Sequence, residues 1–88
     1  MKILIAEVFF DFNEKYKNET ELFLQNLTEK DWIKTDSKRN WKVKLSEKQS
    51  EEFNLNILKG TINEVLELSK IESIDYIIIT ENLVYLNV

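Results

Sequence analysis

The stretch IDYIIIT, residues 74–80, carries the strongest β-strand pattern in this chain of 88 residues. It is rich in β-branched and aromatic side chains, which favour a pleated strand. Ile77 and Ile79 alternate with Ile78, so both faces of the strand are apolar. In a monomer one of these faces would be exposed. The stretch therefore predicts a sheet with a second apolar face, followed by a last short strand at residues 83–88.

Outward from this stretch, the sequence alternates between strand and helix patterns. A capping box of the Asn-x-x-Glu type at Asn18 and Glu21 precedes a helical stripe of apolar residues, and a second box occurs at Thr61 and Glu64. Apolar residues alternate with polar ones around Trp41. In order, we predict a strand at 2–10, a helix from Asn18 or as early as Asn13, strands at 31–36, 40–45 and 53–57, a helix at about 61–71, and strands at 74–80 and 83–88.

The predicted fold class is α+β. The order β-α-β-β-β-α-β-β resembles a ferredoxin-like split βαβ arrangement with an added strand. In that arrangement two helices cover one face of an antiparallel sheet, and the other face stays open or is paired. The chain has no proline and only one glycine, Gly60, so it shows neither a linker nor a glycine-rich phosphate loop. We therefore expect a single domain over residues 1–88.

The composition excludes several kinds of chemistry. The chain has no cysteine and no histidine, so disulfides, Cys/His zinc sites, Ser-His-Asp triads and cysteine nucleophiles are ruled out. Any metal would have to be a hard cation bound by oxygen ligands. Glu7 interrupts the apolar N-terminus and no small-residue cleavage site follows, so we expect a cytoplasmic protein. No segment is long enough to span a membrane.

Charge is distributed unevenly in this acidic chain, which has a net charge of −4. Residues 30–48 hold seven cations and three anions, so this segment carries +4 and the remainder carries −8. By alternation Trp41 shares its strand face with core residues, whereas Trp32 shares a face with Lys34 and is the better candidate for exposure. The predicted binding residues are Trp32, Lys34, Lys38, Arg39, Lys42 and Lys44.

Three interpretations of this basic segment stay open. Its lysines can form an ordinary solvated face, contact an acidic region of a protein target, or contact nucleic acid through residues 30–48. The two-faced strand at 74–80 and the last strand also predict a homodimer, because a small domain gains stability by burying such a face. The predicted dimer interface comprises Ile77, Ile79, Leu83 and Tyr85.

Two segments carry a resemblance to a known group of proteins. VFFDFNEKY, residues 8–16, places Asp11 after an apolar strand and before a helix, and residues 52–86 supply a second helix and two strands. This pattern resembles the small ferredoxin-like dimers of CRISPR spacer acquisition and the related type V antitoxin ribonuclease. The resemblance implies that Asp11 is a catalytic and metal-binding residue, which would use Mg2+ or Mn2+ to activate water for phosphodiester cleavage. No cluster of arginine or lysine follows Asp11 directly, which departs from that catalytic pattern.

Two functional classes follow. We expect a non-enzymatic interaction protein of the inhibitor, antitoxin, immunity or anti-defence type, with no cofactor, that acts by protein–protein contact. Its small size, its acidity and its lack of catalytic side chains favour this class. The alternative is a metal-dependent endonuclease or a nucleic-acid-binding protein of the ferredoxin-like group. Salt-dependent binding to RNA or DNA would distinguish the two.

Overall fold

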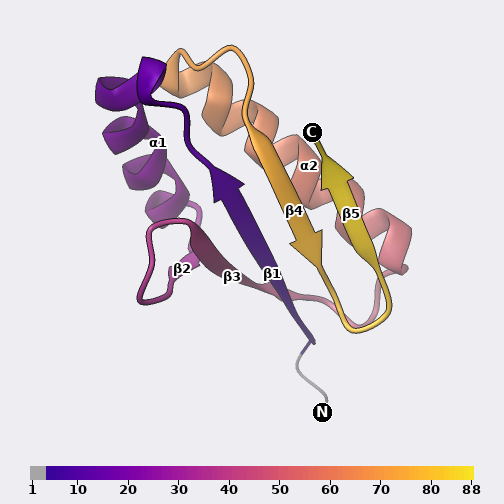
Figure 1. Cartoon of the computed structure of the whole chain (residues 1–88). Helices are drawn as coiled ribbons and strands as arrows, with labels where there is room; N and C mark the ends of the chain where they lie inside the picture. The colour runs from indigo at the N-terminus through magenta and orange to yellow at the C-terminus, as the bar shows by residue number, and fades with distance from the viewer. Residues whose placement is uncertain (1–3) are drawn as a thin grey trace.

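The computed structural model describes residues 4–88, and the predicted start of the first strand at Lys2 lies outside this range. Figure 1 shows the path of the chain. The elements are β1 (Leu4–Asp11), the short 3-10 helix η1 (Glu14–Tyr16), α1 (Lys17–Glu29), β2 (Ile33–Lys34), β3 (Asn40–Leu45), α2 (Glu51–Ser69), β4 (Asp75–Ile79) and β5 (Val84–Asn87).

The five strands form one sheet in the order β2-β3-β1-β4-β5, and every neighbouring pair is antiparallel. The predicted α+β class with an antiparallel sheet is therefore confirmed. This arrangement is compatible with a ferredoxin-like fold. β1 occupies the centre of the sheet, which explains why its sequence is apolar on both faces.

One face of the sheet packs into the hydrophobic core. Ala6, Val8 and Phe10 of β1 are at most 3% exposed, and they share the core with buried residues of both helices. The ring of Phe10 meets that of Phe23 edge-to-face, with 5.1 Å between ring centroids. In Figure 1 α2 runs behind β4 and β5, so the face of these strands opposite α2 is turned toward the viewer.

The predicted strand at 53–57 is wrong, because these residues belong to α2. The hydroxyl of Ser50 accepts a hydrogen bond from the backbone N–H of Phe53 at 3.1 Å and caps the helix. Asn54, Leu58 and Ile62 are buried at a spacing of four residues. The alternation of apolar residues at 53–57 therefore does not mark one face of a strand. Phe53 and Ile57 are 50% and 46% exposed on the surface of α2.

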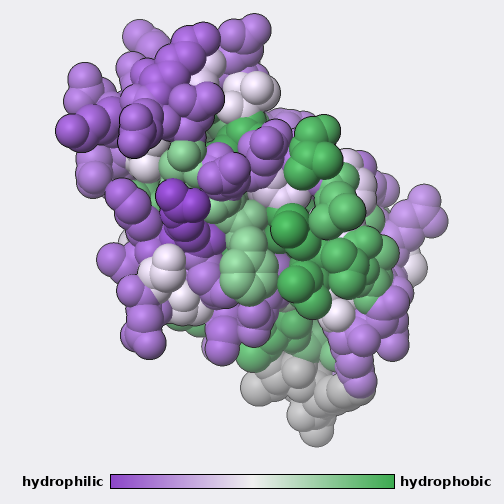
Figure 2. All heavy atoms as spheres, viewed as in Figure 1, coloured by the Kyte–Doolittle hydropathy of each residue, from purple (hydrophilic) through white to green (hydrophobic). Residues whose placement is uncertain are grey.

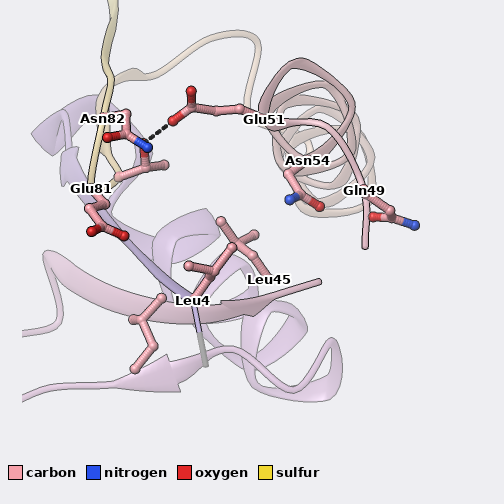
Figure 3. Close-up of a pocket in the computed structure, with 9 residues that line it drawn as sticks. Leu4, Leu45, Gln49, Glu51, Asn54, Glu81 and Asn82 are labelled. Atoms are coloured by element: carbon pink, nitrogen blue, oxygen red, sulfur yellow. Dashed lines mark hydrogen bonds between the residues drawn. The ribbon is translucent and has the colours of Figure 1, made fainter. Parts of the chain in front are cut away.

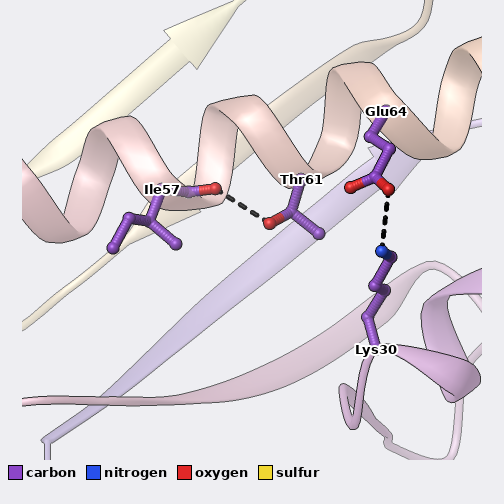
Figure 4. A network of polar contacts seen from close by, with 4 residues as sticks. All are labelled: Lys30, Ile57, Thr61 and Glu64. Atoms are coloured by element: carbon purple, nitrogen blue, oxygen red, sulfur yellow. Dashed lines mark hydrogen bonds and ion pairs between the residues drawn. The ribbon is translucent and has the colours of Figure 1, made fainter.

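The two predicted capping boxes do not cap helices. α1 begins at Lys17, so Asn18 lies inside its first turn, while the side chain of Asn13 caps η1 instead. Thr61 lies in the middle of α2, where its hydroxyl donates to the Ile57 carbonyl at 2.9 Å. Glu64 reaches across to Lys30, with 2.9 Å between Oε1 and Nζ, as Figure 4 shows. This ion pair links α2 to the segment that follows α1.

The two strands of the basic segment, residues 30–48, differ from their prediction in two respects. β3 has the predicted bounds, but β2 contains only Ile33 and Lys34. Both tryptophans are buried, with Trp32 6% and Trp41 1% exposed. The predicted exposure of Trp32 is therefore wrong. Alternation failed here because Trp32 precedes β2, and its ring stacks on Phe10 inside the core at 6.3 Å between centroids.

Candidate interaction surface

The open face of the sheet is built by the residues that alternate with the core residues. In β1 these are Ile5, Glu7 and Phe9, which lie between the buried Ala6, Val8 and Phe10. The antiparallel register places Phe9 opposite Ile77 and Ile77 opposite Leu86. The neighbouring row places Ile79 next to Val84 on the same face. Side chains from the two ends of the chain thus meet on one surface.

We call six of these side chains the apolar strip: Ile5, Phe9, Ile77, Ile79, Val84 and Leu86. Val84 and Leu86 are 60% and 59% exposed, and Ile5 is 49% exposed. Figure 2, in the same view as Figure 1, shows hydrophobic atoms gathered over β4 and β5. A contiguous exposed apolar patch on a small domain marks a surface for contact with another molecule.

Sequence reasoning found only part of this strip. It singled out Ile77 and Ile79 but missed the contribution of Ile5, Phe9, Val84 and Leu86. The alternation in residues 4–11 and 84–87 is a usable signal for the two faces of each strand. It does not show which strands are neighbours, so the assembled patch could not be predicted.

Charged side chains border the strip on β3, and the carboxylate of Glu7 lies within it, opposite Ile79. Lys42 and Lys44 are exposed and lie on the open face, where Lys42 stands opposite Glu7 and Lys44 opposite Ile5. The alternating residues of β3 hold this strand to the core, because Trp41 is buried and Val43 and Leu45 pack partly against the core. The predicted division of β3 into a basic face and an apolar face is therefore confirmed.

The remaining predicted binding residues lie elsewhere. Lys38 and Arg39 are exposed in the turn before β3, where the Arg39 Nη1 lies 3.4 Å from Asp11 Oδ1. The turn is held by the indole N–H of Trp41, which donates to the Lys38 carbonyl at 2.8 Å. Lys34 is exposed at the edge strand β2. The buried Trp32 is not part of any surface. The structure therefore does not gather the predicted binding residues into one patch.

Asp11 lies at the exposed end of β1, directly opposite Asp75 of β4. The two carboxyl groups are accompanied by the Arg39 guanidinium, which balances one of the negative charges. Within residues 4–88, no group of three or more acidic, histidine or cysteine side chains is arranged to hold a metal ion. Asp11 and Asp75 are thus neighbours across the two strands, and the Arg39 guanidinium lies beside Asp11.

The four predicted dimer residues do not share a surface. Ile77 and Ile79 lie on the apolar strip, whereas Tyr85 is on the opposite face, where its ring lies 4.5 Å from the Nζ of Lys59 on α2. Leu83 lies at the hairpin, where its carbonyl accepts from the Thr80 N–H at 2.8 Å. A dimer through the open face would use Ile77 and Ile79 without Tyr85.

A cavity of about 230 Å³ lies where the start of α2 meets the β4–β5 hairpin. Figure 3 shows apolar side chains, among them Leu4 and Leu45, below a polar rim. The Thr80 hydroxyl donates to Glu51 Oε1 at 2.9 Å, and the buried Asn54 donates to the Ser46 carbonyl at 2.9 Å. The bond between Thr80 and Glu51 links the end of β4 to the start of α2 beside the cavity.

Comparison with known proteins does not assign this surface. No known family model matches the chain, and comparisons with curated proteins and with solved structures likewise give no match. Within residues 4–88, no helix combines the length and hydrophobicity that crossing a membrane requires. The functional proposal below is therefore based on the geometry of the open face.

Proposed function

We propose that this protein is a non-enzymatic interaction protein of the cytoplasm, of the inhibitor, antitoxin, immunity or anti-defence type, that acts by protein–protein contact. The observation that carries the proposal is the apolar strip, which occupies the open face of the sheet and is bordered by Lys42 and Lys44. Both helices of a ferredoxin-like fold would cover the other face. This leaves the strip free to meet a target.

The chemistry of the strip defines the target surface that it fits. Burial of exposed apolar area contributes about 25 cal/mol per Å², so contact with an apolar surface supplies the driving force. Lys42 and Lys44 favour carboxylates at the edge of that surface. The partner is therefore a protein with an apolar patch and an acidic border. The net charge of −4 disfavours a polyanion such as RNA or DNA.

Site-specific photo-crosslinking tests this proposal. A photoreactive phenylalanine analogue at Phe9 should capture the target in cells that express it, whereas the same analogue at Asn63, exposed on α2, should not. The captured protein is then purified and its affinity measured. Ile79→Lys should weaken binding at least about tenfold, because it replaces an apolar side chain that the target would bury with a charged one. Leu68→Lys, at an exposed apolar position on α2, should leave binding unchanged. Equal effects of the two substitutions would refute the proposal.

The opposition of Asp11 and Asp75 favours a second candidate function, metal-dependent cleavage of nucleic acid. Two neighbouring carboxylates can bind Mg2+ or Mn2+, which would activate a water molecule. We expect the purified protein to leave RNA and DNA intact in the presence of either ion. Cleavage that disappears in Asp11→Ala and persists in the control Glu81→Ala would instead establish the nuclease.

A further inference from the structure

The two edges of the sheet differ in how they are protected. The β2 edge is two residues long and carries the exposed Lys34, with Asp31 and Asp36 close by in the chain. Short strands and charges of this kind block the pairing of a further strand. The β5 edge has no such protection, because residues 82–88 contain neither a charged residue nor a proline.

The hairpin contacts show which backbone groups of β5 face outward. The Thr80 N–H donates to the Leu83 carbonyl, so these two residues form a hydrogen-bonded pair next to the turn. Hydrogen-bonded and non-hydrogen-bonded pairs alternate along an antiparallel ladder. Val84 opposite Ile79 and Leu86 opposite Ile77 are consequently non-hydrogen-bonded pairs. The N–H and C=O groups of Val84 and Leu86 therefore point away from β4, toward the free edge.

We infer that the β5 strands of two copies of this chain pair antiparallel across a two-fold axis and join their sheets into one. The sequence of β5 is self-complementary in this pairing. With Leu86 at the axis, Val84 lies opposite Val88 of the second copy, and Tyr85 lies opposite Asn87 of the second copy. Apolar side chains then meet on the open face, and no like charges meet along the strand.

The position of Lys59 supports this register. Its ammonium group lies over the Tyr85 ring on the helix side of the sheet. A register centred on Tyr85 would bring the two Lys59 side chains together at the axis, whereas the register centred on Leu86 separates them along the strands. This inference goes beyond the contact with a target, because it uses the backbone of β5 and leaves the apolar strips of both copies on one continuous face.

Amide hydrogen exchange at two protein concentrations tests the inference. Above the dimer dissociation constant, sedimentation should give twice the chain mass of 10.5 kDa. The amides of Val84 and Leu86 should then exchange at least about tenfold more slowly than in the dilute monomer. The Tyr85 amide, which faces β4, should be protected at both concentrations. A monomer at high concentration, or a dimer in which the Val84 and Leu86 amides exchange freely, would overturn the inference.

Two substitutions at one position separate the backbone from the side chain. Leu86→Pro removes an outward N–H that the β4–β5 ladder does not use, so a folded monomer is expected. Leu86→Ala keeps the N–H and should still dimerise. If Leu86→Pro does not fold, the exchange measurement on the unsubstituted protein decides. Ile79→Lys should dimerise normally even if it loses the target, so failure of the target proposal and failure of this inference are distinguishable.

Discussion

Ile78 and Ile79 are adjacent in the chain but lie on opposite faces of β4. Ile78 is fully buried in the core, and Ile79 is 38% exposed on the apolar strip. Ile78→Ala should lower the free energy of unfolding by about 3 kcal/mol, because it leaves a cavity among packed side chains. Ile79→Ala should lower it by less than about 1 kcal/mol, because less apolar area leaves the folded structure.

Urea denaturation of the two variants measures this difference. Because a domain of this size has modest stability, Ile78→Ala can be too unstable to give a folded baseline. Ile78→Val then replaces it, with an expected loss of about 1 kcal/mol. Equal losses at the two positions would show that the two faces of β4 are buried alike.

Tyr76 makes stability depend on pH in the alkaline range. Burial, with a smaller contribution from repulsion by Tyr85, raises the pKa of the Tyr76 phenol above its ordinary value of 10.0. The folded protein therefore keeps this proton at pH values where the unfolded chain releases it. The free energy of unfolding should fall as the pH rises above about 10, since the folded state then binds more protons than the unfolded state.

Tyr76→Phe should remove this part of the alkaline loss. Denaturation followed from neutral pH to the alkaline limit measures the slope in both proteins. The absorbance of tyrosinate in the folded protein gives an independent check. The tyrosine ionisation at the highest pH should disappear in the variant. An unchanged slope would mean that Tyr76 titrates alike in the folded and unfolded states.

At the scale of the element, the start of α2 depends on one serine. The Ser50 hydroxyl accepts from the Phe53 N–H, and the carboxylates of Glu51 and Glu52 lie in the first turn, where they interact favourably with the helix dipole. Ser50→Ala should lower the free energy of unfolding by about 1 kcal/mol, measured by urea denaturation.

Ser46→Ala is the matched control for the cap. The Ser46 hydroxyl accepts from the Lys48 N–H at 3.2 Å within the loop before α2, so it caps no helix. Its loss should change stability by no more than about 0.5 kcal/mol. If both serines contribute equally, the cap is not what sets the start of α2.

At the scale of the whole molecule, residues 30–48 carry a positive charge in an otherwise acidic chain, and we expect folding not to depend on it. Lys44→Glu should leave the melting temperature nearly unchanged, since Lys44 is exposed opposite the uncharged Ile5. In the double variant Lys42→Glu, Lys44→Glu, position 42 faces Glu7, so a loss of up to about 1 kcal/mol is expected. Binding to the captured target should weaken and lose part of its dependence on salt.

The double variant Lys17→Glu, Lys48→Glu changes the net charge equally at exposed positions away from the open face. It should bind the target as the unsubstituted protein does, apart from a general effect on association rate. If the two double variants bind alike, total charge and not the position of the lysines governs the contact. If Lys42→Glu, Lys44→Glu unfolds, these lysines are structural.

The sequence by itself determined the strands that carry strong local patterns. β3 has the predicted bounds, and β4 differs from its prediction by one residue at each end. The strand predicted at 2–10 is present as β1, which runs from Leu4 to Asp11 within the described residues. These features follow from local alternation and side-chain shape, which act within a few residues and need no information about distant parts of the chain.

Only the tertiary structure decided the state of residues 53–57, the burial of Trp32 and the composition of the apolar strip. Alternation at 53–57 suits a strand, but burial of Asn54 and Leu58 against the core favours the helix that Ser50 caps. Phe9, Ile77 and Leu86 become neighbours only through the order β1-β4-β5 and its register. Strand order depends on which faces can be buried together, and that is a property of the packed chain as a whole.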